Sequence, residues 1–561
     1  MSLIAGYSSK KIDSLHFKNK IAGFQILHGD NESDYDNELV NYSSSGVGCK
    51  IKRKTLDSFT QLSVTGASIF CLGFNEFIEK NKNKPSSRYT FNELIKKIKE
   101  ADGEYIVTAI SSDSKIHIIS DRNGSRPCFY AEMHEGFYFS SNITFLGHLV
   151  PTRLSFDILG LLQILNFDHT IGNRTNFNEI KRVRPAEHIV IENGKIVEKN
   201  IYFKLRYKDV TINDYRYFAE EVYAKLKKSV EKRSDGRIGF VSLSGGLDSR
   251  LIASAVDPSR FDAFTFIDSL SQKNTPDVTY SKKIAEKLHL RHHIKSLDNS
   301  AFISDSIDSI LRLTGGQISI IHSSKVNEYI KQMKKNGFHL GGGPGDTLAG
   351  SQVFSHDLNF NSAAVSTFVN NKICYSSEFL QSIFNGYLTD GLDEYLKKSL
   401  SESLNEKNES VLPKAATLWG MTERQPAFTM NSPIHNHPDV AESSPHLGYE
   451  YEDLMMFVNG SDLIRKNFYK FLIYHCLPEL RMVEYANTGK LIHSQHIEYF
   501  YGTPFKSLMT NVDKVSIKLA AYLNKIRKKS ALSFQYEMVI DDKKAISNTK
   551  KILSNNRSVF K

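Results

Sequence analysis

Hydrophobic and polar positions follow two different periods along the chain. Over the first 150 residues, short apolar and aromatic runs at 105–110, 115–119 and 136–140 are separated by polar turns. This pattern predicts β-strands. Residues 154–205 are expected to be a connector, within which 187–196 predicts a hairpin around an Asn-Gly turn.

From residue 214 the pattern changes to strands that alternate with helices. A helix is expected from Asp214 to about Ser229, and alternation of this kind indicates a parallel sheet. From about residue 357 the chain is expected to be mainly helical, with a basic helical tail at its end. The strands are expected at 238–243, 264–267, 292–297 and 338–340, and the helices between them at 279–288, 303–313 and 324–335.

The most informative motif follows the strand at 238–243 and reads Ser244-Gly245-Gly246-Leu247-Asp248-Ser249. Glycines let a backbone turn approach an anion, and N–H groups of the turn and of the following helix point at it. The two serine hydroxyls add donors, whereas Asp248 beside a phosphate implies an intervening Mg²⁺. The spacing differs from the G-x-x-x-x-G-K-[ST] loop. It resembles the pyrophosphate loop of enzymes that split ATP into AMP and pyrophosphate; the alternative is a turn that merely joins a strand to a helix.

Length and charge indicate how many domains to expect and whether the protein binds nucleic acid. A chain of 561 residues is expected to form two or three domains. The net charge of +10 comes largely from short lysine groups, which are typical of solvated helix faces, and no nucleic-acid module accompanies them. We therefore predict no nucleic-acid partner.

Cysteine usage and hydropathy predict a cytoplasmic protein. The five cysteines are scattered without a C-x-x-C pair, which fits a reducing compartment. No run approaches the about 18 apolar residues of a membrane span, and the first residues lack the pattern of a signal peptide.

Five segments together resemble the asparagine synthetase family, in the family's order and over most of the chain. They are Asp102-Gly103 with 121–130, the loop 244–249, the segment 275–293, the segment 341–350 and, more weakly, 444–449. The resemblance implies a mixed α/β and α+β fold: an N-terminal Ntn-hydrolase-like β sandwich with helices, then a parallel-sheet ATP-pyrophosphatase domain (adenine nucleotide alpha hydrolase-like) with helical additions. The expected domains are residues 1–205, 210–500 and a basic tail, 501–561.

The resemblance also implies which residues use ATP. Asp248 and Asp346 would be catalytic and hold Mg²⁺ against the pyrophosphate, although Asp346 is also a suitable helix N-cap. The residues expected to bind ATP and pyrophosphate are Leu243, Ser244, Gly245, Gly246, Leu247, Asp248, Ser249, Gly342 and Gly343.

The N-terminal domain departs from the family at three positions. Active members expose an N-terminal cysteine, whereas this chain starts Met1-Ser2, and a serine hydroxyl is far less nucleophilic near neutral pH. The family's glutamine-binding "NGEIYN" is replaced by 70–75, and its "SD-x-E" by 89–92. We therefore predict an inactive glutaminase domain, with Ser2 as its sole candidate nucleophile.

The second domain departs from the family at its acid-substrate site. The two acids that flank the retained Asp in the family are Gly343 and Thr347 here. A late lysine that stabilises charge at the adenylate has Lys490 as its nearest candidate. Arg250 and Arg424 are candidates for binding a phosphate or carboxylate, with surface salt bridges as the alternative. Arg250, Thr347, Arg424 and Lys490 are thus the predicted substrate-binding residues, whereas the His435/His437 and His292/His293 pairs are expected to be structural.

The function expected is that of an ATP-dependent amide-forming ligase, with ATP and Mg²⁺ as cofactors. A small-molecule carboxylate would form an acyl-adenylate, which ammonia or another amine would attack. Amidation of a sugar carboxylate in surface-polysaccharide synthesis, and β-lactam or lasso-type ring closure, are alternatives within this chemistry. A non-catalytic ATP-binding scaffold and a nucleic-acid-modifying enzyme are alternatives from other classes, and a homodimer is the assembly considered.

Overall fold

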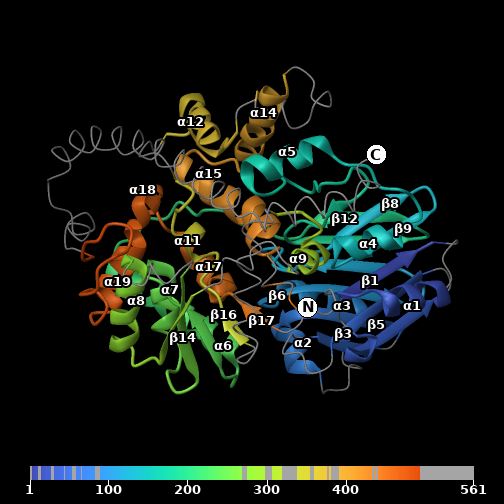
Figure 1. Ribbon diagram of the computed structural model, residues 1–561, viewed down its shortest axis with the longest axis horizontal. Coiled ribbons are helices and arrows are strands. Elements are labelled where there is room, and N and C mark those ends of the chain that lie inside the picture. Colours follow the sequence, from blue (N-terminus) through green and yellow to red (C-terminus); the bar gives the residue numbers. More distant parts are fainter. Residues whose placement is uncertain are drawn as a thin grey trace, which may run out of the picture.

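A computed structural model places two parts side by side, with a layer of helices above both (Figure 1). The N-terminal part is drawn in blue and cyan, and the sheet of the second part in green and orange. The residues that the structure describes are 3–9, 14–26, 31–42, 45–52, 59–64, 66–82, 89–267, 275–296, 306–318, 338–353, 359–375, 378, 380, 391–432, 435, 437 and 440–492.

Two six-stranded antiparallel sheets form the N-terminal part. Their strands are β1 (Leu3–Ser8), β2 (Tyr35–Tyr42), β3 (Ser45–Lys52), β4 (Phe59–Val64), β5 (Ala67–Asn75), β6 (Gly103–Ser111), β7 (Ile116–Ser120), β8 (Phe129–Met133), β9 (Gly136–Ser140), β10 (Lys181–Arg182), β11 (Glu187–Glu192) and β12 (Lys195–Ile201). The first sheet has the order β10-β8-β9-β1-β3-β2 and the second the order β12-β11-β7-β6-β5-β4.

The two sheets pack face to face, and helices cover their outer faces. Side chains of both sheets, such as Ile4, Phe139 and Ile106, share one buried cluster between the sheets. Helices α1 (Ser14–Gly23) and α4 (Ile143–Leu149) contribute to the cluster on the outer face of the first sheet. Helices α2 (Glu76–Asn81) and α3 (Phe91–Glu100) do the same on the second sheet, and η1 (Glu32–Asp34) precedes β2.

A five-stranded parallel sheet organises the second part. Its strands are β13 (Gly239–Ser242), β14 (Phe261–Ile267), β15 (His292–Ser296), β16 (Phe338–Leu340) and β17 (Ala441–Ser443). The order is β15-β14-β13-β16-β17, and every neighbouring pair is parallel. The chain adds β14 and β15 on one side of β13 and then β16 and β17 on the other. The order therefore reverses between β13 and β16, which is where such sheets bind ligands.

Helices cover this sheet and also form the layer that lies above both parts. Apolar residues of α6, α7, α8 and α19 pack in one cluster with the sheet. In the upper layer, Leu162 of α5 is buried with Phe368, Leu400 and Trp419 (Figure 1). The helices are α5 (Ile158–Phe167), α6 (Tyr215–Ser234), α7 (Leu247–Ala253), α8 (Pro276–Lys287), α9 (Ser306–Thr314), α11 (Gly345–Leu348), α12 (Ser362–Lys372), α14 (Leu392–Asn405), α15 (Leu412–Trp419), the π-helix η5 (Gly420–Thr429), η6 (Pro445–Leu447), α17 (Tyr449–Met455), α18 (Gly460–Leu463), η7 (Ile464–Lys466) and α19 (Asn467–Cys476).

The predicted fold class is confirmed by these sheets. The strands expected at 136–140 and 338–340 have the predicted bounds, and the 187–196 hairpin turns at Asn193 and Gly194, both at positive φ. The expectation of a connector at 154–205 is wrong, because this segment supplies α5 and three strands that complete both N-terminal sheets. Strand β17 was not predicted. The helix expected at 324–335 and the tail after 492 lie outside the described residues, and the domain boundaries remain predictions.

The turn at 121–126 links the two parts of the chain. Asp121 accepts hydrogen bonds from the backbone N–H groups of Asn123 and Ser125, which close the turn. From this turn, Arg122 pairs with Asp453, 3.2 Å away, and the guanidinium of Arg126 donates to the carbonyl oxygens of His435 and Glu442. The motif that carried the resemblance therefore docks the N-terminal part on the second part.

A buried ion cluster lies in the same interface. Arg233 of α6 is fully buried, and its guanidinium bonds the carboxylates of Asp102 (3.1 Å) and Glu104 (2.8 Å). Glu104 also accepts hydrogen bonds from the Ser443 hydroxyl and the Ser444 N–H at the end of β17. The N-terminal part thus holds the end of a strand that borders the predicted site.

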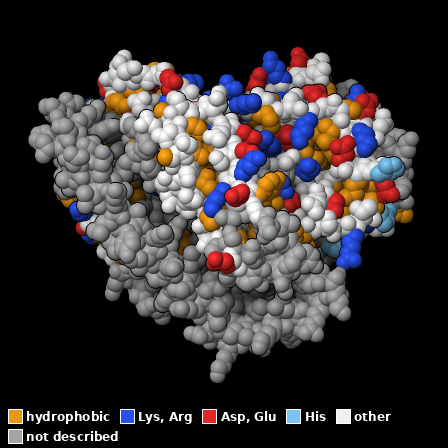
Figure 2. Space-filling view, turned by 90° about the horizontal axis from the view of Figure 1, so that it is seen from above, with side chains coloured by type: hydrophobic (Ala, Val, Ile, Leu, Met, Phe, Trp, Pro, Cys, Tyr) orange, Lys and Arg blue, Asp and Glu red, His pale blue; other side chains and the backbone are white. Residues whose placement is uncertain are grey.

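Three further observations concern membrane spans, thiols and surface charge. Within the described residues, no helix is both long and apolar enough to cross a membrane. All five cysteines are free thiols. Positive and negative side chains are interspersed on the face that Figure 2 shows.

We expect Arg233→Met to destabilise the protein by about 3–5 kcal/mol, because it leaves two buried carboxylates without their cation. The measurement is the midpoint of thermal unfolding. Lys225→Met is the control, since Lys225 pairs with Glu450 where both side chains are about one-third or more exposed, and such pairs contribute little. Equal midpoints for the two variants would contradict the proposed importance of the buried cluster.

Candidate active site

Three loops meet at the carboxyl edge of the parallel sheet. The loop 244–249 follows the central strand β13, the segment 341–346 follows its neighbour β16, and residues 444–448 follow β17. A Cβ atom built on Gly342 would lie 3.7 Å from the backbone nitrogen of Ser249, so the first two loops are in contact. The sheet order therefore brings together segments that are about 100 residues apart in sequence.

The loop 244–249 is held in shape by its own hydroxyls. The Ser249 hydroxyl accepts the Ser244 N–H (3.2 Å), and the Ser244 hydroxyl accepts the Gly246 N–H (3.1 Å). The carboxylate of Asp277 accepts the Gly245 N–H at 3.1 Å. Helix α7 begins at Leu247, so its first N–H groups, which lack partners within the helix, lie at the same turn.

Glycine is required at position 245 because neighbouring residues approach the backbone. A Cβ atom there would lie 2.7 Å from the Cβ atom of Ala486 and 3.2 Å from Tyr280. Ala486 also donates its N–H to the Gly245 carbonyl oxygen. The segment 485–490 therefore packs directly against the loop.

Lys466 pairs with Asp248 at the centre of the site. Its ammonium lies 3.1 Å from Asp248 Oδ2, and both side chains are less than one-fifth exposed. Sequence reasoning missed Lys466, whose signal is weak: an Arg-Lys pair before an apolar helix. The structure thus brings Lys466 to Asp248, whereas the predicted Lys490 side chain is exposed.

The backbone that presents Lys466 is in an unusual conformation. Arg465 and Lys466 have φ values of 54° and 57°, in the left-handed region that non-glycine residues rarely adopt. Such conformations cost about 1–3 kcal/mol each and cluster at functional sites. The geometry places the lysine at the start of α19, directly beside the loop that carries Asp248.

Asp248, Asp346 and Lys466 act on one another electrostatically. Burial raises the pKa of Asp248 above its usual value of 3.8, Lys466 opposes that shift, and the nearby charge of Asp346 adds to it. Burial would lower the pKa of Lys466, but Asp248 and Asp346 outweigh it and raise that pKa. The site thus holds one cation facing two carboxylates.

The arrangement of these carboxylates fits a magnesium ion bound to a triphosphate. Asp248 Oδ1 is buried and has no hydrogen-bond partner among the described residues, although Oδ2 is paired with Lys466. No group of three or more His, Cys, Asp or Glu residues in the described ranges could hold a metal. Mg²⁺ needs only one or two protein carboxylates when phosphates complete its shell.

Aromatic residues and a histidine form the wall behind the site. The ring of His446 lies under Gly345, where a Cβ atom would come within 2.5 Å of it, and burial lowers the pKa of His446 to about 3. The ring therefore stays neutral near pH 7. The hydroxyls of Tyr451 and Tyr469 form a hydrogen bond with each other. The hydroxyl of Tyr485 interacts electrostatically with Lys466 and Asp248.

Arg250, which was predicted to bind a substrate or phosphate, has backbone partners in the structure. Its side chain is fully buried, and its guanidinium donates to the carbonyl oxygens of Leu480, Val483 and Glu484 at 2.9–3.1 Å. The terminal nitrogens of this guanidinium therefore bind the protein backbone. Arg250 instead fixes the chain at 480–484 behind the phosphate loop.

Two other predicted substrate residues also have structural surroundings. Thr347 is fully buried, and its hydroxyl accepts a hydrogen bond from Gln425 Nε2 at 2.5 Å. Lys490 closes the turn of the segment 485–490 through its backbone, because its carbonyl oxygen accepts the Tyr485 N–H. Their contact with a substrate remains a prediction. Arg424, in contrast, lies near Asp346.

The residues that replace the family's glutamine-binding segments form a strand and two helix caps. Residues 70–75 belong to β5, and Asn75 caps α2 by accepting the Ile78 N–H at 3.0 Å. Thr90 and Glu93 form a capping box at the start of α3. Ser2 lies outside the described residues, so its role remains a prediction.

The histidine pairs do not meet as metal ligands in the described structure. His435 and His339 are buried on either side of Glu442, with ring nitrogens 3.2 and 3.3 Å from its carboxylate. His293 pairs with Asp262. The cluster lies beside Arg126 of the N-terminal part and belongs to the interface.

Comparison with protein families matches both parts of the chain. The asparagine synthase domain matches residues 221–463, and a glutamine amidotransferase domain matches residues 95–203. The chain has the two-domain architecture of the asparagine synthetase family. Its two domains are those of an ATP-dependent amidotransferase or ligase. No curated protein matches the chain in sequence.

Solved structures resemble parts of the chain at low identity. The allosteric regulatory enzyme of purine biosynthesis is 11% identical, over 53% of this chain and 80% of that one, with a TM-score of 0.24. An NH3-dependent NAD synthetase from Campylobacter jejuni is 14% identical, over 35% and 97%, with a TM-score of 0.19. These TM-scores are too low for either likeness to support a conclusion.

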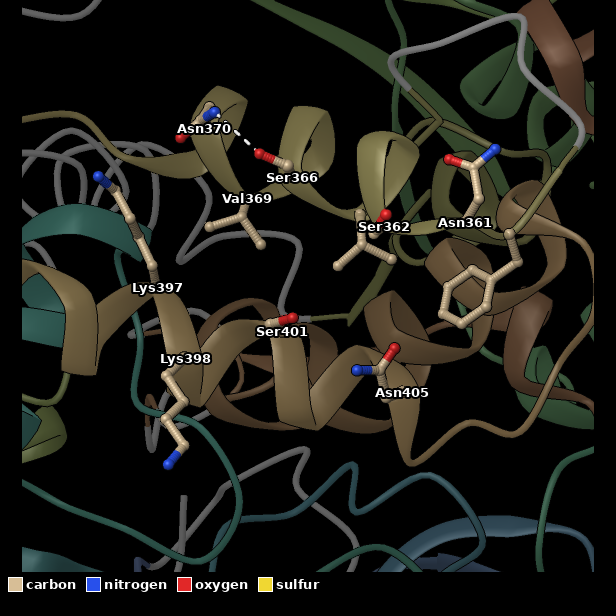
Figure 3. Close-up of a pocket in the computed structure, with 11 residues that line it drawn as sticks. Asn361, Ser362, Ser366, Val369, Asn370, Lys397, Lys398, Ser401 and Asn405 are labelled. Atoms are coloured by element: carbon tan, nitrogen blue, oxygen red, sulfur yellow. Dashed lines mark hydrogen bonds between the residues drawn. The ribbon is translucent and has the colours of Figure 1, made fainter.

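A separate groove lies between α12 and α14 (Figure 3). Its volume is about 510 Å³, and serine, asparagine and lysine side chains line much of it. None of the predicted site residues lines this groove. It is therefore distinct from the carboxylate site at the sheet edge.

Lys466→Met is expected to weaken binding of Mg²⁺ with α,β-methylene-ATP and to change its pH dependence. Asp248 must be ionised to hold a cation, so binding is lost as the pH falls through the raised pKa of Asp248. Removing Lys466 removes the charge that lowers this pKa. The midpoint of the loss should therefore move to higher pH, as measured by calorimetric titration at several pH values.

Lys490→Met is the matched control for this experiment. Its side chain is exposed, so its removal should leave the affinity and the midpoint unchanged. The account of the site would be wrong if the Lys490 variant showed the shift and the Lys466 variant did not.

Proposed function

We propose that this protein is an ATP-dependent amide-forming ligase that activates a carboxylate as an acyl-adenylate. The observation that carries the proposal is the Asp248–Lys466 pair, which lies beside Asp346 at the point where the sheet order reverses. The substrate carboxylate would attack the α-phosphorus of ATP and displace pyrophosphate. Ammonia or another amine would then attack the adenylate, form the amide and release AMP.

Each residue of the site has a part in this reaction. The loop 244–249 would bind the pyrophosphate through its hydroxyls and backbone N–H groups. Lys466 would stabilise the negative charge that develops as pyrophosphate leaves, because its donors are already positioned in a poorly solvated site. Asp248 and Asp346 would hold Mg²⁺, which supplies charge neutralisation for the triphosphate when bound.

The N-terminal domain is proposed to lack glutaminase activity. Its counterparts of the glutamine-binding segments cap α2 and α3, and its 121–126 turn docks the second domain. These contacts support a domain that is retained for the stability of the whole. The nitrogen of the amide would then come from free ammonia or from an amine substrate.

Asp248→Asn is expected to reduce the release of AMP and pyrophosphate by more than about 100-fold, since charge stabilisation by a bound metal is worth several kcal/mol. The assay follows both products from Mg·ATP with a panel of acids that includes aspartate, uronic acids and nucleotide sugars. Ammonia and glutamine are supplied in separate reactions. We expect product release with ammonia and no glutamate from glutamine.

Asp262→Asn is the control, since this carboxylate pairs with Arg291 and His293 at the opposite end of β14. It should leave product release unchanged. Binding of Mg·ATP without release of AMP for any acid would contradict the ligase and favour an ATP-binding scaffold. Glutamate release from glutamine would contradict the inactive glutaminase domain.

A further inference from the structure

We propose that Arg424 binds a second anionic group of the acid substrate. This inference rests on the proposed ligase function and narrows its substrate class. The acid would carry the carboxylate that reacts and, in addition, a second carboxylate or a phosphate. An α-amino acid held through its ammonium group would not fit such a site.

Arg424 lies on a segment that runs along the second loop of the site. It belongs to the π-helix η5. In this helix, the Gln425 side chain donates a hydrogen bond to the Thr347 hydroxyl. The methyl group of Thr429 lies close to Gly343, since a Cβ atom built on Gly343 would be 3.3 Å from it. These contacts place η5 beside the segment that carries Asp346. Insertions of this helix type are frequent at functional sites.

The position of η5 is fixed on its other side by a buried carboxylate. Glu423 is almost fully buried and accepts the Gly172 N–H at 2.8 Å. It also pairs with Lys407 at 2.6 Å and with Arg184 at 3.4 Å. Arg424 is therefore held on a rigid segment, next to a residue whose charge is already neutralised.

Arg424 itself has no such partner. The described residues offer its guanidinium no hydrogen bond and no ion pair; it lies 4.8 Å above the ring of Phe428. Burial lowers the pKa of Arg424, and the charges of Asp346 and Asp168 act on it only from beyond ion-pair distance. Arg424 is partly buried, and a guanidinium that loses contact with water without gaining hydrogen bonds is destabilised; an anionic ligand would supply those hydrogen bonds.

Neighbouring arginines differ from Arg424 because the fold uses their donors. Arg250 bonds backbone carbonyl oxygens, Arg182 donates to the carbonyl oxygen of Pro426, and Arg184 pairs with Glu423. Arg424 is thus the guanidinium near Asp346 that the protein's described residues leave available. If a metal ion binds Asp346, the positive charge of Arg424 would be available to the acid substrate.

Neither of the positions that flank Asp346 at 343 and 347 carries an acidic side chain that could bind an ammonium group. Position 343 is glycine, and the Thr347 hydroxyl is occupied by Gln425. An ammonium group placed here would meet the positive charge of Arg424, whereas a carboxylate or phosphate would be attracted by it. The positive charge of Arg424 therefore favours acids with two anionic groups.

The test compares matched acids that differ in the second anionic group. Succinate is paired with succinamate, and glucuronate 1-phosphate with methyl glucuronoside, so the two pairs distinguish a carboxylate from a phosphate. Aspartate is the ammonium-bearing probe. Binding of each acid is measured by calorimetry on the full chain with Mg²⁺ and α,β-methylene-ATP, and AMP release is measured with ATP and ammonia.

In at least one pair, the dianionic acid is expected to bind about 10- to 100-fold more tightly than its partner, as expected of a charge-assisted hydrogen bond. Arg424→Gln should abolish this preference, and Arg424→Lys should retain part of it. Arg237→Gln is the matched control, because its guanidinium also lies 4.8 Å above a phenylalanine ring, that of Phe338, just before β13 at its amino end. It should keep the full preference.

Binding and product release separate this inference from the ligase proposal. The inference is overturned if neither dianionic acid binds the wild-type protein more tightly than its partner. It is also overturned if the preference survives in Arg424→Gln or is lost equally in Arg237→Gln. An intact, Arg424-dependent preference without AMP from any acid would instead overturn the ligase and leave Arg424 as an anion-binding residue.

Discussion

The ion pair between Asp248 and Lys466 is the interaction on which the site depends. Two carboxylates that face the same poorly solvated space repel each other, and the lysine offsets this repulsion. The pair leaves Asp248 Oδ1 without a hydrogen-bond partner among the described residues, so this oxygen is available as a ligand for a cation. The parallel sheet makes this possible, because it sets the loops after β13 and β16 next to each other.

The N-terminal domain contributes to the same edge of the sheet. Glu104 of β6 binds the Ser443 hydroxyl and the Ser444 N–H, and Arg126 binds the carbonyl oxygen of Glu442. These contacts hold the end of β17, from which the third loop of the site begins. These contacts give the domain a structural role at this edge of the sheet, whether or not it hydrolyses glutamine.

The sequence predicted the elements whose patterns are local. Apolar alternation identified the hairpin at 187–196, and the Ser-Gly-Gly-Leu-Asp-Ser motif identified the turn between β13 and α7, because both signals lie within a few residues. Residues that act through tertiary contacts were not identifiable in this way. Lys466 pairs with Asp248, more than 200 residues earlier in the chain. The carbonyl partners of Arg250 at 480–484 are likewise distant in sequence. Strand β17 was also missed, because it joins the sheet through its parallel pairing with β16, which lies about 100 residues earlier in the chain.

A crystal structure of the full chain with Mn²⁺ and α,β-methylene-ATP would test the central claim most directly. The account predicts an anomalous peak between Asp248 Oδ1 and the carboxylate of Asp346, with the triphosphate on the loop 244–249 and Lys466 beside it. A nucleotide bound elsewhere, or a metal ion that touches neither carboxylate, would contradict the account.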